Sequence, residues 1–219
     1  MFNDSEARRE WDALPEQVVP MVTQGDRRLK MLFISQLRAF LGIAPDANAP
    51  TYEDLAAAHE RVLEAVESAA RSVPHDALSK PTPNRGRDMR ELVYNICEMV
   101  DAMTRSLDTH DLAGYPPVDK QYDFKQSRPL ETPDQVADHA LATRTRWIER
   151  VALMGDADAD STVLSHAGET TQYELLERVA MHSTQHLRQI YAFLRDLGVP
   201  VRELSVEEMA PIRLMTSTY

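Results

Sequence analysis

The sequence predicts a mainly α-helical protein, a four-helix bundle preceded by a small α/β segment. Four long stretches repeat apolar residues every three or four positions, so each forms a helix with one apolar face. Thr51, Asp88 and Thr171 each precede such a stretch, with an acidic residue three positions later, which is the spacing of a helix N-cap. Four amphipathic helices in one chain bury their apolar faces against each other, and we therefore expect a bundle.

Residues outside the four helices have a different pattern. Two β-rich runs flank a turn at Gly25-Asp26, which predicts a hairpin, and short helices are expected from about Ser5 to Leu14 and from Ser35 to Gly42. We divide the chain into an α/β segment at 1–44, a linker at 45–50, the bundle at 51–198 and a tail at 199–219. Within the tail, Ser205 is expected to open one short helix.

Composition excludes several classes of function. A net charge of -11 and a pI near 5.1 oppose binding to nucleic acid, which requires a basic surface. No apolar run has the length of a membrane span, and the first residues lack the order of a signal peptide, so we expect a cytoplasmic protein without a membrane partner. The single cysteine, Cys97, excludes an internal disulfide and is expected to be a packing residue.

Two histidines interrupt the apolar face of the helix expected over 171–197. That face comprises Leu175, Val179, His182, His186, Gln189, Phe193 and Leu197. The i, i+4 spacing of His182 and His186 lets two imidazoles converge on one metal ion. A structural pair, hydrogen-bonded to carbonyls or to Gln189, is the alternative, but two buried imidazoles are difficult to satisfy without an ion, a ligand or water.

Polar residues also occupy inward positions on two other helices. His59 lies among apolar neighbours on the first helix and is either a satisfied core residue or a third metal ligand. Asn95 is either a buried amide bonded to a neighbouring helix or a contact to a ligand or substrate. The aperiodic segment 108–131 carries Tyr115 and Tyr122 and could form a lid. The acidic run 156–160 is expected to be a solvated loop, and His75, His110, His139 and His166 are expected to be solvated.

Residues 51–198 resemble the DinB/YfiT-like superfamily of metal-binding bundles. The resemblance rests on H-x-x-x-H-x-x-Q at His182, His186 and Gln189, and on RDMRELVYNI at 87–96. It implies a metal site in which the third histidine of the family falls on Asn95. Either His59 or Glu98 then supplies the third ligand, or the metal is weak or absent, because an amide oxygen is a poor ligand for zinc or nickel. His59 is preferred because its face points inward.

The N-terminal segment resembles the C-terminal half of a glutaredoxin or glutathione transferase. Val19-Pro20, Gly25-Asp26 and Phe40-Leu41-Gly42 follow the order of that fold. The resemblance implies that Val19, before a cis Pro20, pairs its backbone with glutathione. An ordinary hairpin is the alternative.

Together the resemblances imply a metal-dependent enzyme that uses a low-molecular-weight thiol, glutathione, for S-transfer, isomerisation or lyase chemistry on a small electrophile. The metal would be zinc in the first place, or nickel, iron or manganese, held by His182, His186 and His59. Asn95 and Gln189 would orient the ligand, and Tyr115 and Tyr122 would exclude water. The alternatives are a non-catalytic binding bundle with a vestigial site and a metal-dependent hydrolase without a thiol. Exposed Met and Leu positions favour a homodimer.

Overall fold

The computed structural model divides the chain into two compact units, Met1–Ala47 and Asn48–Tyr219. Their boundary falls inside the linker expected at 45–50. The structure describes residues 9, 12, 21–30, 33–44, 46–82, 86–111, 129–151, 153–165 and 168–213. Each unit is described separately.

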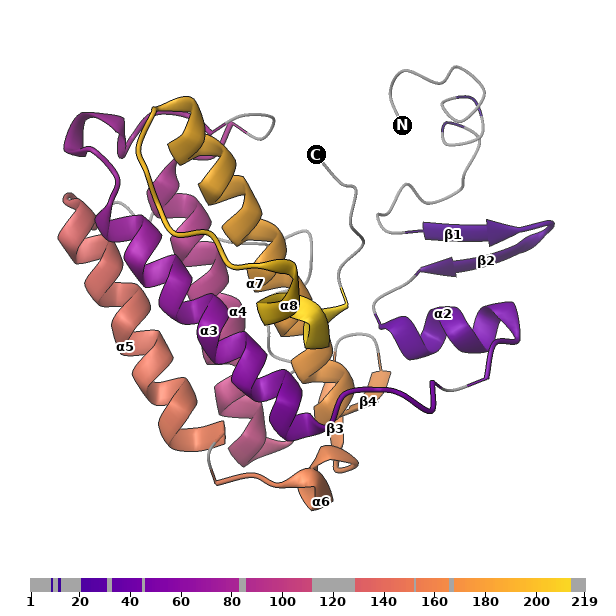
Figure 1. The fold of residues 1–219 in the computed structure, drawn as a ribbon. Helices are drawn as coiled ribbons and strands as arrows, with labels where there is room; N and C mark the ends of the chain where they lie inside the picture. The colour runs from indigo at the N-terminus through magenta and orange to yellow at the C-terminus, as the bar shows by residue number, and fades with distance from the viewer. Residues whose placement is uncertain are drawn as a thin grey trace. The chain divides into compact units, whose positions relative to one another are not determined.

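The first unit contains a hairpin and a helix, as predicted (Figure 1). Strands β1 (Met21–Gln24) and β2 (Arg27–Lys30) pair antiparallel around a turn at which Gly25 has a φ of 59°. Helix α2 (Ile34–Leu41) ends at Gly42 in the left-handed conformation that glycine favours. The Arg27 guanidinium lies 4.4 Å from the centre of the Phe40 ring and donates to the Phe40 carbonyl at 2.7 Å, which joins hairpin and helix.

Most of the first predicted helix, from about Ser5 to Leu14, lies outside the described residues, as do Val19 and Pro20. The glutaredoxin-like role of Val19-Pro20 therefore stays a prediction.

The second unit is built on four long helices, which confirms the predicted helical bundle (Figure 1). They are α3 (Tyr52–Arg71), α4 (Met89–Thr109), α5 (Pro133–Val151) and α7 (Gln172–Asp196). Helices α3 and α4 each pack mainly against α5 and α7, so α3 and α4 lie diagonally across the bundle. A short 3₁₀ helix, η1 (His75–Ala77), lies on the connection between α3 and α4.

Side-chain caps start three of these helices at the predicted residues. The Thr51 side chain accepts a hydrogen bond from the Asp54 amide at 3.0 Å, and Thr171 accepts from the Glu174 amide at 3.1 Å. Asp88 forms a reciprocal capping box with Glu91. Each such cap contributes about 1 kcal/mol by satisfying amides that the helix itself leaves unpaired. The local sequence therefore determines where α3, α4 and α7 begin.

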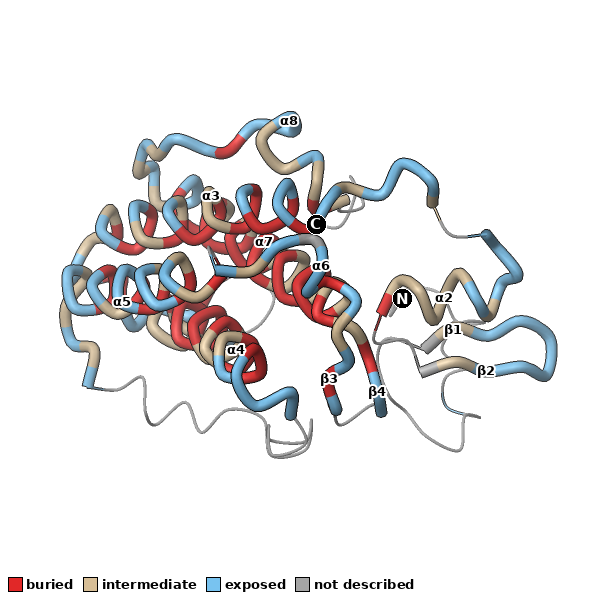
Figure 2. The backbone as a smooth tube through the Cα atoms, turned by 90° about the horizontal axis from the view of Figure 1, so that it is seen from below, coloured by how far each residue is buried: buried red, intermediate tan, exposed pale blue. Residues whose placement is uncertain are grey.

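The core lies between the inner faces of the four helices (Figure 2). Fully buried residues on these faces include Leu55, Leu92, Trp147, Leu176 and Ile190. The buried surface of α7 is broader than the predicted stripe, because α7 packs against α3, α4, β4 (Gly168–Thr171) and the C-terminal tail. Helix α7 is thus the central element of the bundle.

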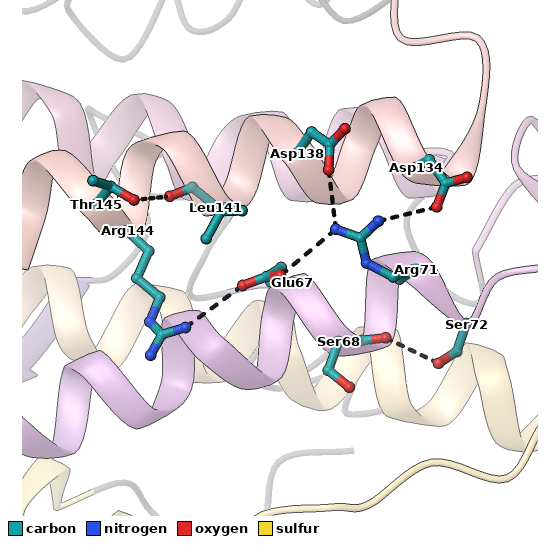
Figure 3. A network of polar contacts seen from close by, with 9 residues as sticks. All are labelled: Glu67, Ser68, Arg71, Ser72, Asp134, Asp138, Leu141, Arg144 and Thr145. Carbon is teal, nitrogen blue, oxygen red and sulfur yellow. Dashed lines mark hydrogen bonds and ion pairs between the residues drawn. The ribbon is translucent and has the colours of Figure 1, made fainter.

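Ion pairs cover the outer edge of the contact between α3 and α5. Figure 3 shows Arg71 of α3 donating to Asp134 and Asp138 of α5, each at 3.0 Å, while Arg144 of α5 lies 3.6 Å from Glu67 of α3. Each helix therefore supplies a cation that pairs with acids of the other. These exposed pairs add little free energy to two helices that are held together by their apolar faces.

The segment before α7 differs from the expectation. The acidic run 156–160, expected to be a loop, contains the short helix α6 (Asp156–Ala159). Strand β3 (Thr162–Ser165) then pairs antiparallel with β4, and this second hairpin leads directly into α7. Val163 is fully buried, so the hairpin packs on the core.

The tail beyond α7 folds back onto the bundle. As expected, Ser205 caps a short helix, α8 (Val206–Met209), which is followed by the 3₁₀ helix η4 (Ala210–Ile212). Ile212 is fully buried, and Arg61 of α3 donates to the Glu208 carbonyl at 3.3 Å. Among the described residues, no helix combines the length and the apolar character that crossing a membrane requires.

His139 is not solvated, contrary to the expectation for the four remaining histidines. It is half-buried on α5, and its ring stacks on Tyr94 with the ring centres 5.6 Å apart. Burial lowers the pKa of His139, because a charged ring loses hydration there. His75 and His110 are exposed as expected, and His166 lies outside the described residues.

We predict that Leu55→Ala lowers the free energy of unfolding by about 2 to 5 kcal/mol, because it removes a fully buried side chain and leaves a cavity. Leu153→Ala is the matched control. Leu153 is 74 % exposed, and its removal should change stability by no more than about 0.5 kcal/mol. Urea unfolding followed by circular dichroism measures both, and equal effects would contradict the core described above.

Candidate metal centre

Helices α4 and α7 bring three predicted site residues together in the bundle. Nε2 of His186 lies 2.9 Å from Nδ2 of Asn95 on α4 and 3.2 Å from Nε2 of His182 on α7. Asn95 is 1 % and His186 is 6 % exposed, whereas His182 is half-buried. The two imidazole rings meet edge to face, with their centres 4.5 Å apart. Both histidine Nε2 atoms therefore point toward one small region beside Asn95.

Gln189 fixes the orientation and tautomer of His186. Its Oε1 lies 2.8 Å from Nδ1 of His186, and a carbonyl oxygen can only accept a hydrogen bond. Nδ1 of His186 therefore carries the proton, and the lone pair of Nε2 faces His182 and Asn95. A histidine that ligates a metal usually donates its other ring N–H to an oxygen in this way.

The contact between the two histidines requires a group between their nitrogens. Two imidazole lone pairs repel at 3.2 Å, so either the N–H hydrogen of one neutral ring or a metal ion must lie between the Nε2 atoms. With a proton, Nε2 of His182 donates to Nε2 of His186. In either case the buried Nδ1 of His182 has no hydrogen-bond partner within the described part of the chain.

His182 is held in the neutral form that binds metals. Its pKa lies well below the ordinary value, chiefly because burial disfavours the charged ring and further because of the nearby His186, Arg178 and Arg87. A neutral imidazole does not have to lose a proton before it coordinates a metal.

The donor atoms fit a divalent ion. Two nitrogens each about 2.0 to 2.1 Å from one tetrahedral zinc ion lie about 3.3 to 3.4 Å apart, close to the 3.2 Å between the two Nε2 atoms. Among the described residues, no group of three or more His, Cys, Asp or Glu side chains could hold a metal. Two imidazoles and the Asn95 amide are the side-chain groups that meet here.

Residues 93–190 match the family model of the DinB superfamily. The match covers less than half of the chain and shows that this segment is similar to the DinB superfamily. It runs from α4 to α7 and contains Asn95, His182, His186 and Gln189. No curated protein matches the sequence.

His59 lies in a separate polar pair of this DinB-like bundle. Its Nε2 is 3.0 Å from the Ser183 hydroxyl oxygen, and its ring meets Trp147 edge-on at 4.6 Å. His59 is fully buried, and its Nδ1 has no hydrogen-bond partner among the described residues. Its role as third metal ligand stays a prediction. Sequence reasoning missed Ser183, although its position four residues after the buried Val179 indicates an inward side chain.

No described contact joins the remaining predicted residues to the centre. Glu98, the alternative third ligand, is half-buried on α4. Tyr115 and Tyr122 lie outside the described residues, as does most of the predicted lid, so the lid stays a prediction.

Cys97 of the DinB-like segment is a packing residue, as expected. It is 1 % exposed, and burial raises the pKa of its thiol to about 12. A thiol in this environment is neither ionised nor accessible, so it cannot serve as a nucleophile or a metal ligand.

A recess of about 420 Å³ lies between α3 and α5. Its lining includes Tyr52, Ala56, Trp147, Val151 and Met154. No described residue of the Asn95, His182 and His186 group lines it. The recess is therefore distinct from the candidate centre.

We predict that the free energy of unfolding falls as the pH is lowered from about 6.5 toward 3. Burial lowers the pKa of His59 from 6.5 to about 3, so over this range the unfolded chain binds a proton that the folded chain does not. This group alone contributes a loss of up to about 1.4 kcal/mol per pH unit.

Urea unfolding at pH 7.5, 6 and 5 tests the effect. His59→Gln should show a shallower loss of stability than the parent, while His75→Gln, which alters an exposed histidine, should keep the parent slope. An unchanged slope in His59→Gln would contradict the assignment.

Proposed function

We propose that His182 and His186 bind a divalent metal ion, zinc before nickel, iron or manganese, and that the protein uses a low-molecular-weight thiol such as glutathione as a co-substrate. The reaction would be S-transfer, isomerisation or lyase chemistry on a small electrophile. The observation that carries the proposal is the convergence of two imidazoles, with Nε2 atoms 3.2 Å apart, inside a segment that matches the family model of the DinB superfamily.

The residues around the centre have distinct tasks in this proposal. His182 and His186 hold the ion, and Gln189 keeps the Nε2 lone pair of His186 directed at it through the 2.8 Å hydrogen bond at Nδ1. When bound, a divalent ion with an open coordination position lowers the pKa of a thiol and keeps it as a thiolate nucleophile.

Two observations favour an external, anionic co-substrate. Cys97 is the only cysteine of the chain, and its buried thiol cannot react, so thiol chemistry requires a thiol from solution. Arg87 and Arg178 lie close enough to His182 to lower its pKa through their charge. Their guanidinium groups favour a ligand that carries a carboxylate or a thiolate.

Three parts of the proposal rest on the sequence alone. Tyr115 and Tyr122 would exclude water from the centre, and the backbone of Val19, held by Pro20, would bind the peptide part of the thiol. The third part is His59 of α3, which would supply a further metal ligand.

A non-catalytic binding bundle is the second candidate, and one observation favours it. Both ring nitrogens of His186 have hydrogen-bond partners within the protein, Gln189 at Nδ1 and Asn95 at Nε2. A histidine pair that is satisfied in this way can persist as a structural feature. The third candidate, a metal-dependent hydrolase, would be active without any thiol.

We predict that the purified protein retains or takes up about one zinc, nickel, iron or manganese ion per chain and that His182→Ala does not, because a single buried imidazole cannot retain the ion. Elemental analysis after dialysis measures the content. His75→Ala is the matched control, since it removes an exposed imidazole, and it should keep the metal. A parent protein that binds no metal even on reconstitution would favour the non-catalytic bundle.

We also predict that glutathione binds the metal-loaded protein with measurable heat in calorimetry and binds His182→Ala more weakly. S-methylglutathione, which keeps the peptide but has no thiol to ionise, should bind more weakly to the parent. Exchange of Val19-Pro20 for Ala-Ala should lower the affinity for glutathione. Equal binding of both peptides to parent and variant would rule out a metal-bound thiolate.

A further inference from the structure

We infer that the recess between α3 and α5 binds a linear organic diamine, a molecule in which an apolar chain joins two ammonium groups. The recess lies within the second unit, and none of its lining residues belongs to the candidate metal centre. The inference therefore goes beyond the proposed function and does not depend on it. The volume of the recess, about 420 Å³, falls within the range of about 300 to 1,000 Å³ that is usual for small-molecule sites.

Contacts between α3 and the α5 segment locate the two ends of the recess (Figure 1). At one end, the Tyr52 hydroxyl donates to Sδ of Met154, just beyond the end of α5, at 3.8 Å. At the other end, Glu60 of α3 lies 3.5 Å from Arg144 of α5. The recess occupies the first half of α3, between these two contacts.

The floor of the recess is apolar. Ala56 and Ala57 of α3 carry only methyl groups, so this part of α3 leaves room beside Trp147 and Ile148 of α5. Ala56 and Trp147 are buried, and Val151 completes the lining on α5. An alkyl chain that lies here removes its methylene groups from water, which favours binding.

Two carboxylates border this floor. Glu53 and Glu60 are seven residues apart and therefore lie on the same face of α3. At a rise of about 1.5 Å per residue, their backbones are separated by about 10 Å along the helix axis. Among the described residues, no group of three or more His, Cys, Asp or Glu side chains could hold a metal ion. Carboxylates at this separation suit a molecule with a positive charge at each end.

The protein balances the charge of these carboxylates only in part. Glu53 makes no ion pair within the described part of the chain. Arg144, the partner of Glu60, is also 3.6 Å from Glu64 and from Glu67, so one cation serves three acids. None of the described lining residues is Lys, Arg or His. The net charge of -11 adds a long-range attraction for cations, so the recess favours a cationic ligand over an anionic one.

The test measures the binding of octamethylenediamine to the full chain by calorimetry at low ionic strength. Octylamine, which has the same alkyl chain and one ammonium group, is the reference probe. The diamine should bind saturably and about two- to fivefold more tightly than octylamine, because it forms a second, exposed ion pair. Putrescine, a diamine with half as many methylene groups, should bind more weakly than octamethylenediamine.

Four variants separate the recess from the overall charge of the protein. Glu53→Gln and Glu60→Gln each remove the charge at one end, and in each the diamine should lose its advantage over octylamine. Glu169→Gln is the matched control, because it changes the net charge equally at an exposed residue of β4 that does not line the recess. Ala57→Trp fills the recess from an exposed position and should weaken the diamine by at least about tenfold, because it displaces two or more methylene groups.

The inference is overturned if Glu169→Gln reduces the preference for the diamine as much as Glu53→Gln does, or if Ala57→Trp leaves the affinity unchanged. Either result would show only a general attraction of cations to an acidic protein. The absence of saturable binding would overturn it as well. His182→Ala should bind the diamine as the parent does, so failure of the proposed metal-dependent function is distinguishable from failure of this inference.

Discussion

The apolar interior of the bundle is the constraint on which the centre depends. Four helices bury their apolar faces against one another, and a polar group that points inward costs free energy unless it finds a partner there. His186 meets this demand through Gln189 on its own helix and Asn95 on α4. Each of these partners reduces the freedom of the ring, so its lone pair has a fixed direction before any ligand arrives.

Helix α7 contributes residues to two separate clusters of polar side chains, because consecutive residues on a helix point about 100° apart. His182 contacts His186, which is hydrogen-bonded to Asn95 of α4, whereas its neighbour Ser183 meets His59 of α3. Helices α3 and α4 lie diagonally across the bundle, so these two groups remain separate although they begin at adjacent residues. The arrangement explains how three inward histidines can occur in one bundle with only two of them converging.

The sequence predicted correctly those features that depend on residues close together in the chain. Caps at Thr51, Asp88 and Thr171 are local, and the spacing of His182 and His186 guarantees that they share a face. The partner of His59 depends instead on which helices pack side by side, which the periodicity of a single helix does not contain. The hairpin of β3 and β4 was missed because its strands are four residues each and carry little alternation, and only its packing on the core stabilises it.

The buried Cys97 has a consequence for the conditions in which this bundle can work. A neutral thiol that is 1 % exposed cannot attack a disulfide, because exchange requires an accessible thiolate. As the only cysteine in the chain, it also leaves no second sulfur for a bridge. Oxidised small disulfides, such as those that accumulate when a thiol pool is consumed, would find no point of attachment on the folded protein. The folded protein therefore does not form mixed disulfides with small thiols.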